Sequence, residues 1–410
     1  MMENKAAEQV SPKQKKVGKV WLVLLFGSLT AFGPLSMDMY LPALPIVTTD
    51  MQTTASLAQL SLTACLLGLA GGQLLFGPLS DIQGRRRPLV FTIIIYAVAS
   101  LLAAFSPNIW IFIAMRFIQG FSAAAGIVIA RASARDIYNG KELTSFMALL
   151  ALVHGAAPIL APIFGGTILE WVNWPVIFII LSLIGVVMFL GVFFILPETL
   201  PEENRSEASV LAVFRSFHIL LKDRGFMMIA LTQAMISTSM FAYIAGSPFV
   251  LQNIYNVTPQ QFSFIFAVNG IGIILAAQIT GRLANHMKES NILFGGILMS
   301  LTGSILLLIT AIFDLSIWVI IPAFFLIVSS VGISNTTCFS LGMQRQGKVA
   351  GSASAFLGIL PYAGGAIVSP LVGLGGEYTS VPLGITILIC SLLACGFYAS
   401  LMKSIRNELN

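Results

Sequence analysis

Asp38 is an acidic residue near the end of a long apolar run that begins at Trp21, in the stretch PLSMDMYLPALP (34–45). An ionised carboxylate in hydrocarbon costs several kcal/mol, so such a residue is expected to have a function and a partner. The candidate partner is Arg116, the only basic residue deep inside another apolar run. A buried carboxylate whose distance to a cation changes can bind and release a proton. The two residues therefore predict proton chemistry inside a membrane.

Two other interpretations of these residues stay open. Asp38 and Arg116 could instead form a permanent structural salt bridge. His154 also lies well inside an apolar run, where it could join a proton relay or could be a hydrogen-bonded structural residue.

The composition of the chain places this chemistry in lipid. The 410 residues are 57% hydrophobic and only 10% charged, whereas a soluble globular chain is roughly a quarter charged. Apolar windows of about 20 residues recur along the chain, and each is long enough to cross the bilayer as a helix. Twelve spans are expected, at 19–42, 56–79, 88–105, 108–131, 144–169, 174–196, 225–251, 261–283, 291–313, 316–342, 349–373 and 380–402. The sequence thus predicts an all-α membrane protein whose main partner is the lipid bilayer.

The depths of Asp38 and Arg116 can be estimated from these spans. Asp38 lies about 28 Å up the first helix from Lys19, and Arg116 lies about 12 Å down the fourth helix from Asn108. In helices of about 40 Å that run in opposite directions, these depths coincide. The buried acid and the buried base could therefore meet.

Basic residues set the expected orientation. Lys and Arg gather in both tails and in the loops after the second, fourth, sixth, eighth and tenth spans, while the other loops contain none. The positive-inside rule then predicts that both termini are cytoplasmic. This topology also accounts for the net charge of +5, so no nucleic-acid partner is expected.

The longest polar stretch divides the chain into halves. It predicts a cytoplasmic tail (1–18), a six-helix bundle (19–196), a cytoplasmic linker (197–224), a second six-helix bundle (225–402) and a tail (403–410). The halves repeat, since GPLSD (77–81) corresponds to GRLAN (281–285), and Pro158 corresponds to Pro361. Two pseudo-symmetric bundles of this build place a substrate between them and move by rocking. The linker is treated as a plain connection, with a partner-binding role as the alternative.

No nucleotide or metal signature accompanies these spans. GMQRQGKV (342–349) matches part of a phosphate-binding loop, but it ends in Val349 and follows no strand. We expect no cofactor and no metal, so the energy source is predicted to be an ion gradient, here that of protons.

Four motifs now resemble one family. GPLSDIQGRRRPL (77–89) is similar to the loop between helices 2 and 3 of the major facilitator superfamily, and RFIQG (116–120) to the helix 4 motif of its drug:proton antiporters. APILAPIFGG (157–166) resembles their helix 5 antiporter motif, at Pro158, Ala161, Pro162, Gly165 and Gly166, with Ala161 where the family often has Gly. MDMYLPALP (37–45) with ARDIY (134–138) resembles the bicyclomycin/chloramphenicol-resistance (Bcr/CflA) subgroup.

The loop motif has a physical interpretation as a gate. Gly77, in a motif that also includes Gly84, lets the end of helix 2 pack tightly, and Arg85 can pair with Asp136. The resemblance implies that Asp81 accepts hydrogen bonds from the start of helix 11, near Gly351 and Ser352. The alternative is that the arginines only supply positive-inside charge.

The resemblance also implies an activity and a pocket. It implies proton-coupled export of small amphipathic compounds, such as antibiotics, by a monomer in the bacterial cytoplasmic membrane, with Asp38 as the coupling carboxylate. Uptake or export of a metabolite is the nearest alternative, and a receptor, a scaffold or a membrane enzyme is further away. Polar or flexible mid-span residues are the candidate substrate contacts: Met37, Tyr40, Gln119, Gln233, Ser237, Tyr243, Asn269, Asn335 and Tyr362.

Overall fold

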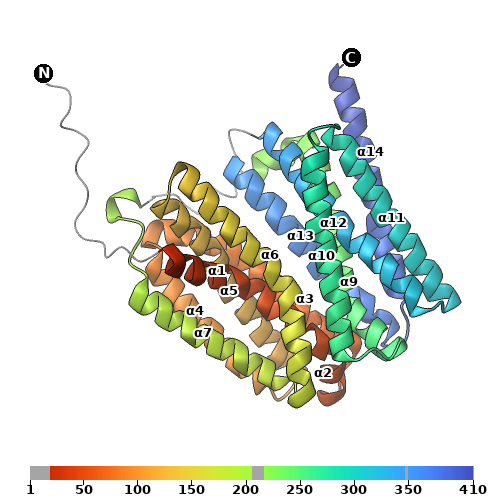
Figure 1. Ribbon diagram of the computed structural model, residues 1–410, viewed down its shortest axis with the longest axis horizontal. Coiled ribbons are helices and arrows are strands. Elements are labelled where there is room, and N and C mark those ends of the chain that lie inside the picture. The colour runs from red at the N-terminus through yellow and green to blue at the C-terminus, as the bar shows by residue number, and fades with distance from the viewer. Residues whose placement is uncertain (1–18, 206–216, 347–349, 410) are drawn as a thin grey trace, which may run out of the picture.

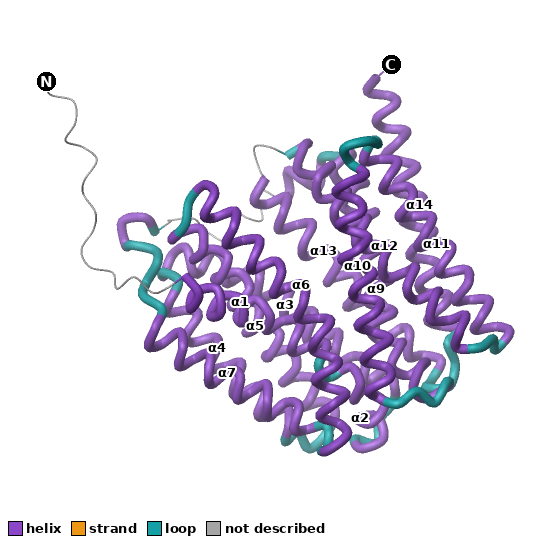
Figure 2. Tube along the Cα trace, viewed as in Figure 1, coloured by secondary structure: helices purple, strands orange, loops and turns teal. Residues whose placement is uncertain are grey.

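The computed structural model describes residues 19–205, 217–346 and 350–409, and in these residues the chain is helical between short loops (Figures 1 and 2). Twelve helical stretches are long and apolar enough to cross a membrane, which confirms the predicted number. The expected N-terminal tail (1–18) and the middle of the linker lie outside the described residues. The long helices are α1 (Lys19–Asp38), α3 (Ala55–Gln83), α4 (Arg86–Ala104), α5 (Ile109–Ile137), α6 (Gly140–Trp171), α7 (Pro175–Ile195), α9 (Arg224–Phe249), α10 (Pro259–Leu283), α11 (Glu289–Phe313), α12 (Ile317–Arg345), α13 (Ala350–Val372) and α14 (Val381–Leu409).

Side chains satisfy the exposed backbone groups at the starts of several helices. The Thr258 and Gln261 side chains form a capping box at the start of α10, and the Asn108 side chain accepts from two backbone N–H groups at the start of α5. Hydropathy detects only the part of a helix that lies in hydrocarbon. As a result α5 continues to Ile137, and Arg131 falls well inside that helix as a second, exposed basic residue.

The first span is broken just after its acidic residue. The helix α1 ends at Asp38, a 3-10 turn covers Leu41–Ala43, and α2 (Leu44–Asp50) completes the span. Proline suits the first turn of a helix, where its missing N–H has no partner to lose. The two prolines of this region therefore begin new elements, whereas the apolar window 19–42 predicts one continuous helix.

The helices form the two predicted six-helix bundles, α1 to α7 and α9 to α14, which lie side by side in Figure 1. The bundles contact each other mainly through α3 with α13 and through α6 with α10. Five hydrogen bonds that join the bundles lie toward one end of the molecule: Ser56 to Pro370, Gln59 to Ala245, Thr63 to Ala366, Gln252 to Pro42 and Ser263 to Pro162, at 2.7–3.2 Å. That end of the interface is therefore sealed.

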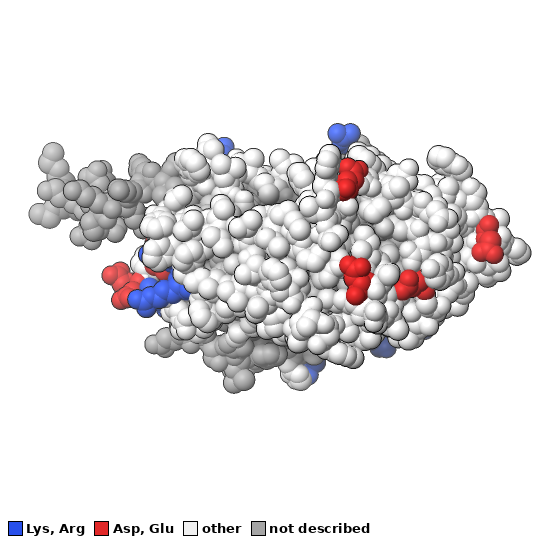
Figure 3. Space-filling view, turned by 90° about the horizontal axis from the view of Figure 1, so that it is seen from below, with Lys and Arg blue, Asp and Glu red and all other residues white. Residues whose placement is uncertain are grey.

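We call the sealed end the acidic end and the opposite one the basic end. Helix ends and loops at the acidic end carry Asp50, Glu170, Asp314 and Glu377, whereas Arg85, Arg282 and Arg345 lie in or next to loops at the basic end. Figure 3 looks onto the acidic end, where red side chains are scattered over the face and blue ones lie only at its outline. The positive-inside rule predicts the orientation of the chain across the membrane from this separation of acidic and basic residues.

Glycine lets α3 and α5 pack with their backbones in contact. A Cβ atom at Gly68 would lie 2.3 Å from the Phe117 carbonyl oxygen, and one at Gly120 would lie 2.2 Å from the Cys65 carbonyl oxygen. Neither distance is sterically possible, so the seam needs glycine on both helices. Close backbone approach of this kind is the main route to tight helix packing in lipid.

The first prediction concerns this seam. Gly120→Ala should destabilise the protein by about 1–3 kcal/mol, because the added methyl group forces α3 and α5 apart. The measurement is the thermal denaturation midpoint of purified protein in detergent. Gly295→Ala on α11 is the matched control, since a Cβ atom there meets nothing within 4 Å. Equal midpoints for the two variants would contradict the packing argument.

Candidate functional site

A cavity of about 340 Å³ lies between the two bundles. Its wall includes Asp38 and Met37 from α1, His154 and Pro158 from α6, and residues of α9, α10, α12 and α13. Five of the nine predicted substrate contacts line it: Met37, Tyr243, Asn269, Asn335 and Tyr362. The cavity therefore combines an acid from one bundle with amide and phenol groups from the other.

Asp38 is the only Asp or Glu that is buried among the described residues, with 5% of its surface exposed. It is the last residue of α1 and lines the cavity. Within the described part of the chain it has neither a hydrogen bond nor an ion pair. A carboxyl group in such a place must be neutral or must gain a partner from elsewhere.

Arg116 is fully buried on α5, and it contacts α1 two residues before Asp38. Its Nη1 donates to the Ser36 carbonyl oxygen of α1 at 2.8 Å and to Oε1 of Gln119. The guanidinium also lies over the rings of Tyr40 and Phe178, 5.1 and 5.4 Å from their centroids. Such cation–π contacts stabilise a desolvated cation by about 2 kcal/mol.

The expected ion pair between Asp38 and Arg116 is not formed in this conformation. The cation instead binds the backbone two residues before Asp38, and its Nε and Nη2 atoms have no hydrogen-bond partner among the described residues. Buried unpaired donors on a cation are costly, so this guanidinium retains the capacity to bind an anion. In this structure Asp38 and Arg116 therefore do not form a permanent salt bridge.

His154 faces the same cavity from α6. Its Nδ1 lies 3.0 Å from the Thr30 carbonyl oxygen, and because a carbonyl can only accept, Nδ1 carries a proton. The other ring nitrogen remains available to exchange a proton. The geometry accommodates both the structural and the relay interpretation of this residue.

The other four predicted substrate contacts lie behind the cavity wall. Tyr40 and Gln119 are fully buried around Arg116, where Gln119 also donates to Ser100 at 2.8 Å. Gln233 and Ser237 donate to Oδ1 of Asn335 at 3.2 and 3.3 Å. Tyr40 and Gln119 therefore hold the cation, and Gln233 and Ser237 orient a residue of the wall.

The antiporter-like motif of α6 works by close packing. A Cβ atom at Gly165 would lie 1.9 Å from the Met39 carbonyl oxygen, directly after the break of α1. One at Gly166 would lie 2.5 Å from Oγ of Ser263, which donates to the Pro162 carbonyl oxygen across the interface. Ala161 is fully buried and Pro158 lines the cavity. The motif thus brings α6 against both the Asp38 region and the second bundle.

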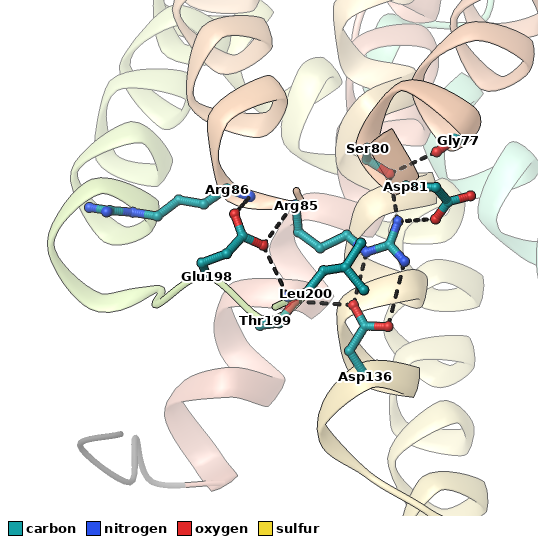
Figure 4. A network of polar contacts seen from close by, with 9 residues as sticks. All are labelled: Gly77, Ser80, Asp81, Arg85, Arg86, Asp136, Glu198, Thr199 and Leu200. Carbon is teal, nitrogen blue, oxygen red and sulfur yellow. Dashed lines mark hydrogen bonds and ion pairs between the residues drawn. The ribbon is translucent and has the colours of Figure 1, made fainter. Parts of the chain in front are cut away.

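A charged cluster surrounds the loop between α3 and α4 at the basic end (Figure 4). Arg85 donates to Asp136 of α5 at 2.8 Å, to the Ser80 hydroxyl at 2.8 Å and to Asp81. Burial lowers the pKa of the Arg85 guanidinium, but the hydrogen bonds and charges of Asp136 and Asp81 outweigh that effect and hold the pKa above its usual range. Arg85 is therefore a fixed cation that ties α3, α4 and α5 together.

The start of the linker completes this cluster, which the sequence did not reveal. Glu198 accepts from the backbone N–H groups of Arg85 and Arg86 at 2.7 and 3.2 Å, and Thr199 donates to Asp136 at 3.2 Å. A carboxylate is stabilised at the N-terminus of a helix such as α4. Gly84 has a φ of 88°, and a Cβ atom there would lie 2.6 Å from Glu198 Oε2. The PET sequence at 197–199 is the only signal for these contacts, and by itself it does not differ from a plain connection.

The contact expected between Asp81 and the start of helix 11, here α13, is not among the hydrogen bonds of the described residues, and the surroundings of Gly351 lie outside them. Among the described residues Asp81 bonds only with Arg85, and its side chain is 43% exposed. This end of the bundle interface carries no hydrogen bond or ion pair between the bundles within the described ranges.

Gly77, the first residue of the loop motif, is not a site of unusually close packing. A Cβ atom at this position would lie 3.5 Å from the Val128 side chain, which is an ordinary van der Waals distance. The expectation that Gly77 is needed for close packing is therefore wrong in this conformation. Gly84 has a positive φ, a backbone conformation that favours glycine.

The second prediction separates the two carboxylates of Arg85. Asp136→Asn should lower the free energy of unfolding by more than about 1 kcal/mol, because it breaks a largely buried pair. Asp81→Asn should lower it by less than about 1 kcal/mol, because exposed pairs contribute little. The side chains of Asp136 and Asp81 are 17% and 43% exposed. Thermal denaturation in detergent measures both, and a larger loss for Asp81→Asn would contradict this ranking.

The chain is similar to known carriers over nearly its full length. The Major Facilitator Superfamily model matches residues 25–370. The uncharacterized MFS-type transporter YdgK of Bacillus subtilis is 42% identical over 384 residues, which cover 93% of this chain and 95% of that protein. A bicyclomycin resistance protein homolog of Haemophilus influenzae is 29% identical over 381 residues, covering 92% and 96%.

A solved structure shares the fold. The crystal structure of a bacterial homologue of the human lysosomal transporter Spinster, in an inward-facing and unoccupied conformation, superposes with a TM-score of 0.74 at 14% identity and covers 95% of this chain and 98% of that one. Together with the twelve spans, these comparisons identify a multi-pass membrane carrier. The chain belongs to the Major Facilitator Superfamily, and its relatives confirm the resemblance to the Bcr/CflA drug:proton antiporters.

Proposed function

We propose that the protein exports small amphipathic compounds across the bacterial cytoplasmic membrane in exchange for protons. The observation that carries this proposal is the position of Asp38, a buried acid that lines the cavity between the bundles and has no partner among the described residues. An acid in that place can hold either a transported proton or a charge that needs a partner. The proton gradient is the proposed energy source, with no cofactor.

The wall of the cavity supports a small organic substrate. Its volume of about 340 Å³ lies in the usual range for small-molecule sites. Met37, Phe241 and Phe266 provide apolar surface, and Asn269 and Asn335 provide polar groups. Mixed walls with flexible Met side chains suit varied ligands. We include antibiotics of the bicyclomycin type among the candidate substrates because one relative is named for resistance to bicyclomycin.

The proposed cycle uses the sealed and open ends in turn. If the basic end is cytoplasmic, as the positive-inside rule predicts, the seal at the acidic end closes the cavity to the outside. A substrate then enters from the cytoplasm or the inner leaflet while Asp38 releases its proton. The bundles rock, the seal opens, and a proton from outside returns to Asp38 as the substrate leaves. We propose that a monomer performs this cycle.

Arg116 is proposed to stabilise the ionised state. Its unpaired Nε and Nη2 atoms and its anchor at the Ser36 carbonyl place a cation close to the end of α1. The break after Asp38 provides a point at which α1 can shift relative to α5. A small shift would then change whether the carboxylate has a cation beside it.

The third prediction tests the role of Asp38. Asp38→Asn should abolish proton-driven efflux of a fluorescent amphipathic dye from energised cells, because an amide cannot exchange a proton. Asp50→Asn is the matched control, since Asp50 lies on α2 at the acidic end and accepts a hydrogen bond from Trp174. Full efflux by the Asp38→Asn protein would refute proton coupling at this residue. Energised accumulation of the dye by the unmodified protein would indicate uptake instead.

The fourth prediction tests the role of Arg116. Arg116→Gln should move the pH profile of substrate binding toward higher pH, because the ionised carboxylate loses its cation. Arg116→Lys should restore much of the profile by keeping the charge. Binding by purified protein across a pH series measures the effect, with gel filtration to confirm folding. An unchanged profile for a folded Arg116→Gln protein would show that the two residues do not interact.

A further inference from the structure

A second hollow of about 640 Å³ lies on the first bundle, away from the central cavity. It is formed by α3, α4 and α5 and lined by apolar side chains that include Leu79, Phe91, Phe117 and Phe121. Gln83 and Arg87 lie in its wall at the basic end. Phe91 is 65% exposed, so this wall faces the lipid. We call the hollow the α3–α5 groove.

The three consecutive arginines of the loop have different environments. Arg85 is committed to the charged cluster, and Arg86 donates to the Phe193 carbonyl oxygen of α7 with its guanidinium over the Phe193 ring. Figure 4 shows Arg86 directed away from the cluster. Arg87 is exposed, lines the groove and has no hydrogen bond or ion pair among the described residues. Only this third arginine presents an unused cation to the groove.

A buried hydroxyl group lies deeper in the same groove. Ser122 of α5 is 3% exposed, and its Oγ atom has no hydrogen-bond partner among the described residues. A hydroxyl in hydrocarbon normally bonds to something. The groove thus offers a cation and an amide at its basic end, an unpartnered hydroxyl further in, and aromatic surface along its length.

We propose that the α3–α5 groove binds an anionic phospholipid. The Arg87 guanidinium and the Gln83 amide would hold the phosphate and headgroup, and an acyl chain would lie along Phe91, Phe117 and Phe121, past the Ser122 hydroxyl. A basic side chain at the membrane surface favours an anionic lipid by about fivefold. The site is independent of the transported substrate and of proton coupling.

The test uses a tryptophan placed in the groove. Phe91→Trp protein is reconstituted in phosphatidylcholine vesicles that contain either brominated phosphatidylglycerol or brominated phosphatidylcholine. The bromine atoms quench tryptophan fluorescence, and the quenching is compared with that of the parent protein. Phe294→Trp is the depth-matched control, because Phe294 lies five residues into α11 as Phe91 lies five residues into α4. Its exposed fraction is 41%.

At Phe91→Trp we expect brominated phosphatidylglycerol to be preferred by about fivefold. Adding Arg87→Gln should remove that preference at Phe91→Trp and leave quenching at Phe294→Trp unchanged. Equal quenching by the two lipids at Phe91→Trp would overturn the proposal, as would a preference that survives Arg87→Gln.

Discussion

Hydrocarbon offers no hydrogen bonds, so a charged side chain that lies in it without a partner is costly. This cost determines the arrangement of the protein. Arg116 is fully buried, and the first bundle is organised around it: a backbone carbonyl, an amide and two aromatic rings surround the guanidinium. Asp38 lies two residues beyond the carbonyl that binds Arg116, at the end of α1 and in the wall of the cavity. One of these charges is held by the protein and the other is exposed to whatever occupies the cavity. That asymmetry is what a proton-coupled carrier needs.

The rest of the structure keeps each bundle rigid so that the interface between them can change. Glycine seams join α3 to α5 and α6 to the break of α1. Arg85, Asp136 and Glu198 bind three helices and the start of the linker into one unit at the basic end. The hydrogen bonds between bundles, by contrast, are few and come mainly from single Ser, Thr and Gln side chains at the acidic end. Such contacts can break and form again at modest cost.

The sequence predicts the twelve helices, the two bundles and the depth of Arg116, because each depends on hydrophobic length or helical rise. It does not predict which way a side chain points around its helix axis. For that reason Asp38 and Arg116 share a depth without an ion pair, and Tyr40 and Gln119 surround the cation instead of lining the cavity. The contacts of Glu198 and Thr199 were equally invisible, because they depend on how a polar segment folds back onto a loop far away in sequence. The seal at the acidic end belongs to one conformation, which no single sequence pattern specifies.

The central claim is that substrate and proton compete for Asp38. The direct measurement is proton release when substrate binds to purified protein in weakly buffered detergent solution. The account predicts that binding releases protons from the unmodified protein at a pH where Asp38 holds its proton, and that Asp38→Asn binds substrate without releasing any. Binding by the unmodified protein with no proton release across the pH range, or equal release by Asp38→Asn, would contradict it.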